Sequence, residues 1–183
     1  MLDQLYAEMK SQMQKTIAHY KDELVKIRTG RASATMLDSV SVDYYGTPQP
    51  LKNIAHVSVP EAQMIVVTPF DPSSLDMIES AILSSDLGMN PNNDGALIRL
   101  NIPALTEERR MEITKYMHKI IEEGKVSIRS IRRDMNDKIK RMKDDGISED
   151  NAKRALDNVQ EFTDESIKKL DTMAADKEKE ILG

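Results

Sequence analysis

The sequence of 183 residues contains no cysteine and no tryptophan, and aromatic residues make up only 4% of it. Without cysteine the chain can form neither a disulfide nor a thiolate-ligated metal site, which agrees with a reducing cytosol. A core must be built from aliphatic side chains and from methionine, which occurs 12 times. No apolar run is long enough to span a bilayer, and the N-terminal segment lacks the apolar stretch of a secretory signal. We therefore expect a cytoplasmic protein without a membrane partner.

The sequence also lacks the motifs of common catalytic and metal sites. Its histidines, His19, His56 and His118, lie far apart and outside any HExxH pattern. No Walker sequence is present. The segment 90–95 resembles the start of a calcium-binding loop, but Asn101 stands where a bidentate glutamate is required. We expect no catalytic residue, no metal site and no cofactor, and we predict that the chain is not an enzyme.

The most informative segment runs from Thr106 to Lys143, and its residue spacing predicts one long amphipathic helix. Apolar residues recur every three or four positions, which places them on one helical face. Basic residues gather along one edge of that face, while acidic residues fall toward the other side. This edge, called the basic flank below, consists of Lys125, Arg129, Arg132, Asn136, Lys140 and Lys143.

The basic flank admits two interpretations. Charged residues on a long helix usually form a solvated face with local ion pairs. However, Arg129, Arg132 and Arg133 concentrate planar guanidinium groups that suit phosphate contacts. Residues 107–143 also hold 12 basic and 7 acidic residues, a net charge of +5, within a chain of net charge −5. This local basic surface favours folded RNA, contacted through phosphates and shape rather than through base stacking or sequence readout.

Two further segments show helical spacing. One runs from Leu2 to Arg28, with Gly30 as a predicted left-handed cap, and the other begins at a predicted N-cap, Ser148, and continues toward Ile181. Each helix has one apolar stripe, and a three-helix bundle is the simplest way to bury all three stripes. The bundle must be elongated, because the helix from Thr106 would be more than about 50 Å long. A bundle that buries its own stripes suggests a monomer.

The region between these helices has a different character, with all seven prolines lying between Pro48 and Pro103. Alternating β-branched residues predict strands here. Asp71 as an N-cap, with Pro72 at the first helical position, predicts a short helix ending near Gly88. The predicted strands cover residues 40–44, a second extended segment through residues 57–59, residues 64–68 and residues 97–102, with 90–95 as a loop.

We therefore predict an α+β protein with an inserted domain. Residues 1–30 and 105–183 form the elongated three-helix bundle, and residues 31–104 form a small β/α/β sandwich domain. The two crossings, at residues 29–31 and 102–106, could act as a hinge or as a rigid corner.

Several blocks of the sequence resemble the bacterial ribosome recycling factor, in order and over essentially the whole chain. These blocks are Lys26–Ser33 (KIRTGRAS), Asp43–Pro48 (DYYGTP), Ser85–Pro91 (SDLGMNP), Leu105–Arg110 (LTEERR) and Val126–Asp134 (VSIRSIRRD). One departure is visible, because Ala34 and Thr35 stand where the family has proline and serine.

The resemblance implies an L-shaped, tRNA-like molecule that acts after termination. With elongation factor G and GTP it would split the post-termination ribosome into subunits, releasing it from mRNA so that it can re-initiate, without being the GTPase itself. An alternative from a different class is a helical adaptor or chaperone that binds protein partners. That alternative explains the amphipathic helices and the methionine content, but it leaves the clustered arginines unexplained.

The resemblance also implies roles for particular residues. Arg132 would be the principal contact to 23S ribosomal RNA of the large subunit, near the A and P sites, with Arg129 and Arg110 in support. Arg133 is added because it adjoins Arg132, and Arg28 because it lies in a matching block. The hinge would consist of Thr29, Gly30, Arg31, Leu105 and Thr106.

Overall fold

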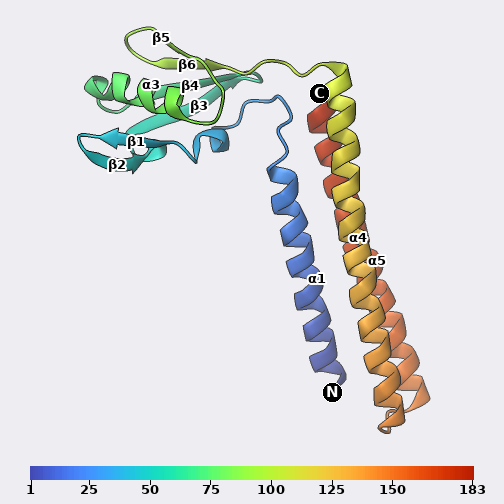
Figure 1. Ribbon diagram of the computed structural model, residues 1–183. Helices are drawn as coiled ribbons and strands as arrows, with labels where there is room; N and C mark the ends of the chain where they lie inside the picture. The colour runs from blue at the N-terminus through green and yellow to red at the C-terminus, as the bar shows by residue number, and fades with distance from the viewer. The chain divides into compact units, whose positions relative to one another are not determined.

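The computed structural model describes all 183 residues, which divide into two compact units (Figure 1). The first unit combines Met1–Thr29 with Glu107–Gly183, and the second is the continuous segment Gly30–Thr106. Helices and antiparallel strands are both present, so the predicted α+β class is confirmed. None of the helices combines the length and the apolar character that a membrane-spanning segment needs.

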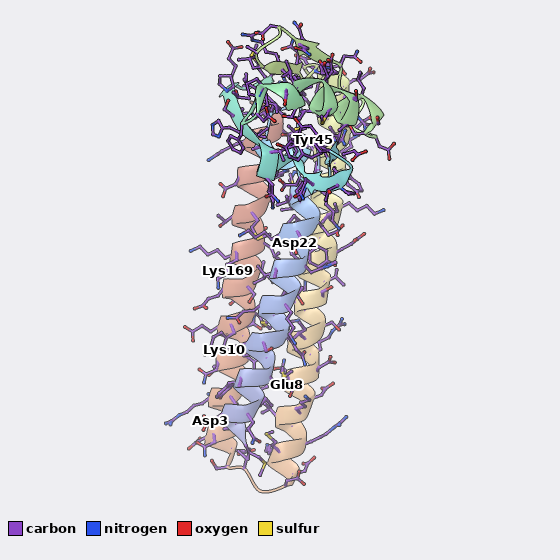
Figure 2. The ribbon with its side chains drawn as sticks, turned by 90° about the vertical axis from the view of Figure 1, so that its left-hand side faces the viewer. Asp3, Glu8, Lys10, Asp22, Tyr45 and Lys169 are labelled. Carbon is purple, nitrogen blue, oxygen red and sulfur yellow. The ribbon has the colours of Figure 1, made fainter.

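The first unit is a bundle of three helices. They are α1 (Leu2–Val25), α4 (Glu107–Asp144) and α5 (Glu149–Leu182). Figure 2 shows α1 lying in front of the two longer helices. The turn from α4 to α5 passes through Gly146 at φ +109°, and the Ser148 side chain then accepts a hydrogen bond from the Asn151 N–H. The predicted N-cap at Ser148 is therefore confirmed.

The three helices bury their apolar stripes against one another. Side chains from each helix are fully buried, among them Met9 from α1, Met135 from α4 and Leu170 from α5. The helices approach one another closely at Gly124, where a Cβ atom would lie 3.1 Å from Cδ2 of Tyr20 and 3.3 Å from Cδ1 of Leu170. A residue without a side chain in the middle of α4 thus lets all three helices meet.

Helix α1 ends earlier than its residue spacing predicts. The predicted end at Arg28, with Gly30 as its cap, is wrong, because the last helical residue is Val25. The N–H of Ile27 instead bonds to the Leu24 carbonyl, three residues back, which tightens the final turn. Gly30 does have a left-handed conformation, at φ +75°, but it lies beyond the helix.

The second unit contains a hairpin and a four-stranded antiparallel sheet. The hairpin joins β1 (Ser41–Tyr44) to β2 (Thr47–Pro50), and both residues of its turn, Tyr45 and Gly46, have positive φ, as in a type I′ turn. The sheet has the strand order β3-β4-β6-β5. Its strands are β3 (Ala55–Glu61), β4 (Met64–Pro69), β5 (Pro91–Asn93) and β6 (Ile98–Asn101).

Helix α3 (Leu75–Ser84) completes the second unit and shares its core with the sheet and hairpin (Figure 1). Its entry is a 3₁₀ turn, η2 (Pro72–Ser74), for which Asp71 is the N-cap, accepting from the Ser73 N–H. The N-cap prediction at Asp71 is confirmed. The buried residues of this core are aliphatic apart from Met89, and include Val42, Leu51, Ile65, Val67, Ile78, Ile82, Ile98 and Leu100.

Three predictions for the second unit need correction. The second extended segment is interrupted by a one-turn helix, α2 (Leu51–Ile54), which turns Leu51 and Ile54 into the core. The predicted loop 90–95 contains strand β5, which pairs with β6. Helix α3 ends at Ser84 rather than near Gly88, because the backbone of Ser85 is extended and its hydroxyl donates to the Ile82 carbonyl. A further 3₁₀ turn, η1 (Ala34–Leu37), precedes the hairpin.

Candidate nucleic-acid interface

The basic flank lies on the side of α4 that faces α5. At one point the Nζ atom of Lys125 lies 2.5 Å from Oδ1 of Asp171, and at another Nζ of Lys143 lies 2.7 Å from Oε1 of Glu149. On its other side, α4 reaches α1 through Lys138, whose Nζ is 2.6 Å from Oε1 of Glu8. The flank therefore borders the junction of α4 and α5.

Most cations of the basic flank have a carboxylate partner within the protein. Lys125 and Lys143 are paired as described above. In addition, the Nη2 atom of Arg129 lies 2.5 Å from Oε1 of Glu122, and Nζ of Lys140 lies 3.8 Å from Oδ1 of Asp137. The bond to Glu149 raises the pKa of Lys143, and the same bond lowers the pKa of Glu149. Both groups of this pair are therefore charged at neutral pH.

Arg132 is the exception in the middle of the flank. It is half-buried, yet it forms no hydrogen bond or ion pair within the protein, and none of its nitrogen atoms is sealed from solvent. Arg133 is exposed and also lacks an internal ion pair. Two adjacent guanidinium groups thus keep all their donors available for an external oxyanion.

Arg110 is placed differently from the arginines of the flank. It is half-buried near the start of α4, where its Nη1 atom donates to the Leu182 carbonyl at 3.1 Å, while its Nε atom is buried without a partner. A cation that bonds to the last carbonyls of a helix also interacts favourably with the helix dipole. Arg110 therefore stabilises the end of α5.

The remaining predicted arginine, Arg28, lies at the same end of the bundle as Arg110. It is exposed, and the next residue, Thr29, is buried and donates its hydroxyl to Oε1 of Glu180 at 3.1 Å. Arg129 lies 19 positions beyond Arg110 on one helix, which corresponds to about 28 Å. The five predicted arginines thus form two groups, one at the middle of α4 and one at the bundle end.

Two of the predicted hinge residues, Gly30 and Leu105, lie in close contact. A Cβ atom on Gly30 would lie 2.9 Å from Cγ of Leu105, so the outgoing and returning segments touch at a residue without a side chain. The N–H of Ala32 bonds to the Ala62 carbonyl at 2.7 Å, which anchors the outgoing segment to the sheet. Gly30 is suited to this place, because its φ of +75° is costly for other residues.

Two carboxylates organise the second unit, and sequence reasoning identified Asp71 only as an N-cap and missed the role of Asp94. Asp71 accepts hydrogen bonds from Ser73, from Tyr45 at 3.1 Å and from Tyr44, and the Ser73 bonds contribute most to its lowered pKa. Asp94 accepts from the backbone of Leu97 and Ala96 and from Arg99, which lowers its pKa to about 2. The Asp94–Gly95 dipeptide between β5 and β6 is a hairpin signal that could have revealed this turn.

Both carboxylates are fully engaged in hydrogen bonds within the second unit. Their hydrogen-bond partners are hydroxyls, backbone N–H groups and one arginine, which keep them ionised and hold turns together. No group of histidine and carboxylate side chains in the chain is arranged to hold a metal ion. The basic flank with the unpaired Arg132, together with the adjacent Arg133, is consequently the surface with the clearest binding chemistry.

Comparison with known proteins gives a consistent result. The sequence model described as "Ribosome recycling factor" matches residues 20–182. The ribosome-recycling factor of Desulfatibacillum aliphaticivorans is 52% identical over 183 residues, covering 100% of this chain and 99% of the relative. That of Bacillus subtilis strain 168 is 46% identical, with the same coverage.

Two solved structures of this kind also match. A solution structure of a ribosome recycling factor is 39% identical, with a TM-score of 0.78 over 99% of this chain and 97% of its own. A second structure places the T. thermophilus ribosome recycling factor and the E. coli elongation factor G on the E. coli post-termination complex. Its recycling factor is 46% identical, with a TM-score of 0.66 over 100% of both chains. These proteins are named for an action on the ribosome rather than for a chemical reaction. The chain belongs to the ribosome recycling factor family.

Proposed function

We propose that this chain acts after the termination of translation. Together with elongation factor G and GTP, it splits the post-termination ribosome into subunits and thereby frees the ribosome from mRNA. Membership of the family supports this proposal, as does the related recycling factor that has been placed with elongation factor G on a post-termination complex. Within this chain, the observation that carries the proposal is that Arg132 and Arg133 of α4 have no ion pair within the protein.

The RNA-binding surface we propose is centred on Arg132. A phosphate that binds there displaces no internal partner, and a half-buried guanidinium is already partly desolvated, which strengthens a charge-assisted bond. Arg133 and Arg129 extend the surface along α4. Arg110 and Arg28 provide a second group of contacts at the bundle end, and the partner is 23S ribosomal RNA of the large subunit near the A and P sites.

The two units have separate roles in this proposal. The bundle, residues 1–30 and 105–183, holds the ribosomal RNA, while the inserted domain, residues 31–104, receives force from elongation factor G. The hinge consists of Thr29, Gly30, Arg31, Leu105 and Thr106. It is supported by the left-handed backbone at Gly30 and by the contact of that residue with Leu105, because both confine bending to a short region.

The protein itself contributes no chemical step in this proposal. It acts as a monomer in the cytoplasm without a metal or a cofactor, and GTP is hydrolysed by the elongation factor. Binding and orientation are then the only properties that its residues must supply. Substitutions on the basic flank should therefore alter ribosome binding without altering the intrinsic GTPase of elongation factor G.

The test measures light scattering of post-termination ribosomes mixed with the cognate elongation factor G and GTP. We expect wild-type protein to lower the scattering as subunits separate, and Arg132→Glu to fail. The matched control is Arg141→Glu, because Arg141 is exposed, unpaired and on the opposite side of the same helix. If both variants fail equally, the role of Arg132 is wrong. If the wild-type protein does not separate subunits, the recycling function is wrong, and binding to a protein partner that resists salt would favour the adaptor interpretation.

A further inference from the structure

The ion pair between Arg129 and Glu122 differs from the other pairs of the basic flank. Both residues belong to α4, and their side chains reach across two helical turns, so that Nη2 and Oε1 lie 2.5 Å apart. The exposed fractions of the two side chains are 41% and 58%. The pair does not connect α4 to another helix, so its removal should leave the bundle intact.

The pair of Lys125 with Asp171 serves as the contrast. It connects α4 to α5, and the Lys125 side chain is only 23% exposed, so its stem packs between the two helices. That pair has a structural role. The Arg129–Glu122 pair lies at a similar position along α4. It stabilises the fold much less, because exposed ion pairs contribute little to the free energy of folding.

A carboxylate and a phosphate bind a guanidinium through the same chemistry, with an anionic oxygen accepting an N–H bond. Glu122 therefore occupies a donor of Arg129 that a phosphate would otherwise use. Arg132, one turn further along the flank, has no such competitor. An RNA that engages both arginines must displace Glu122 from the first but nothing from the second.

We propose that Glu122 is an affinity-tuning residue that competes with RNA phosphate for Arg129. This inference rests on the proposed RNA-binding function of the basic flank. Because Glu122 competes for Arg129, the wild-type protein binds the large subunit less tightly than it would if Arg129 were free. A factor that must leave the ribosome after each round benefits from such a competitor, because weaker binding appears mainly as faster dissociation.

The test compares Glu122→Gln with Glu123→Gln in binding to isolated large ribosomal subunits. Both substitutions remove one negative charge from neighbouring positions of α4, but the Glu123 side chain has no ion pair and lies away from the flank. Exposed pairs typically contribute enough to change an equilibrium by about 1.5- to 5-fold. We expect Glu122→Gln to bind about two- to five-fold more tightly than Glu123→Gln.

A second comparison isolates the partner. In an Arg129→Ala background the advantage of Glu122→Gln over Glu123→Gln should vanish, since the competitor no longer has a donor to occupy. Equal affinity of the two single variants would show that only overall charge matters, and would overturn the proposal. Weaker binding by Glu122→Gln would also overturn it, because Glu122 would then orient Arg129 for RNA rather than compete for it.

Failure of the underlying function gives a different pattern. If wild-type binding to large subunits is insensitive to salt and to Arg132→Ala, the flank does not bind RNA, and both the function and the inference are wrong. If binding depends on salt and on Arg132 while the Glu122 and Glu123 variants coincide, only the inference is wrong.

Discussion

The bundle and the inserted unit are stabilised by different kinds of interaction. The bundle consists of long helices with periodic apolar stripes, and its residues follow the local rules of one helix at a time. The inserted unit has strands of three to seven residues whose pairing depends on partners elsewhere in the chain. Carboxylates such as Asp71 and Asp94 hold its turns, whereas carboxylates of the bundle mainly pair with surface cations. Local periodicity thus organises one unit, and side-chain hydrogen bonds at turns organise the other.

The sharpest test of this comparison removes a core side chain from one unit at a time. Met135 is fully buried between the helices, and we expect Met135→Ala to lower the free energy of unfolding of the bundle by about 2–5 kcal/mol. Hydrogen exchange should show lost protection in α1, α4 and α5 and unchanged protection in the sheet. Ile65→Ala is the control with the opposite pattern. Loss of protection in both units from either substitution would show that they unfold together.

The next largest effect concerns Gly30. We expect Gly30→Ala to destabilise the protein by about 2 kcal/mol, because alanine must adopt a left-handed backbone and its Cβ would meet Leu105 at 2.9 Å. Gly88→Ala is the matched control, since Gly88 also has positive φ, but a methyl group there would meet no atom within 4 Å. Urea denaturation measures both changes. Equal losses would mean that the contact with Leu105 costs nothing beyond the backbone strain.

The smallest effect we predict is a pH dependence in the turn between β5 and β6. The pKa of Asp94 is about 2 in the folded protein, below its ordinary value of 3.8, so its ionised form stabilises the fold. That contribution is complete above about pH 4 to 5 and is lost as the pH falls toward 2. The stability difference between wild type and Asp94→Asn should therefore be constant at neutral pH and shrink across this acidic window. Acid titrations monitored by urea denaturation would reveal it, and a difference that grows on acidification would contradict the assigned hydrogen bonds.

The sequence was sufficient to predict the bundle because each helix carries its own signals. The stripes of α4 and α5 and the N-cap Ser148 are local features, and all of them are found in the structure. The predicted end of α1 lay three residues too late, at Arg28 instead of Val25. No local signal in the sequence reveals that Thr29 bonds to Glu180. In the inserted unit, β5 was missed because Pro91–Asn93 has turn-like composition and becomes a strand only by pairing with β6.

The candidate site was predictable in its residue types but not in its pairing. Helical spacing places Arg129 and Arg132 on one flank, yet it does not reveal that Glu122 engages the first and leaves the second unpaired. Arg110 was expected to contact RNA, and its bond to Leu182, 72 residues away, could not be inferred from sequence. The role of these arginines in RNA binding stays a prediction until the variants are measured.

The bond between Thr29 and Glu180 has a consequence for synthesis of the protein. These residues are 151 positions apart, so at about 5–20 residues per second roughly 8–30 s separate their appearance. The inserted unit is continuous and can fold during that interval, but α1 must wait for α4 and α5 with Leu5, Met9 and Met13 uncovered. A nascent chain of this protein therefore carries an exposed amphipathic helix for most of its translation, and that helix is the segment most open to chaperones and to aggregation.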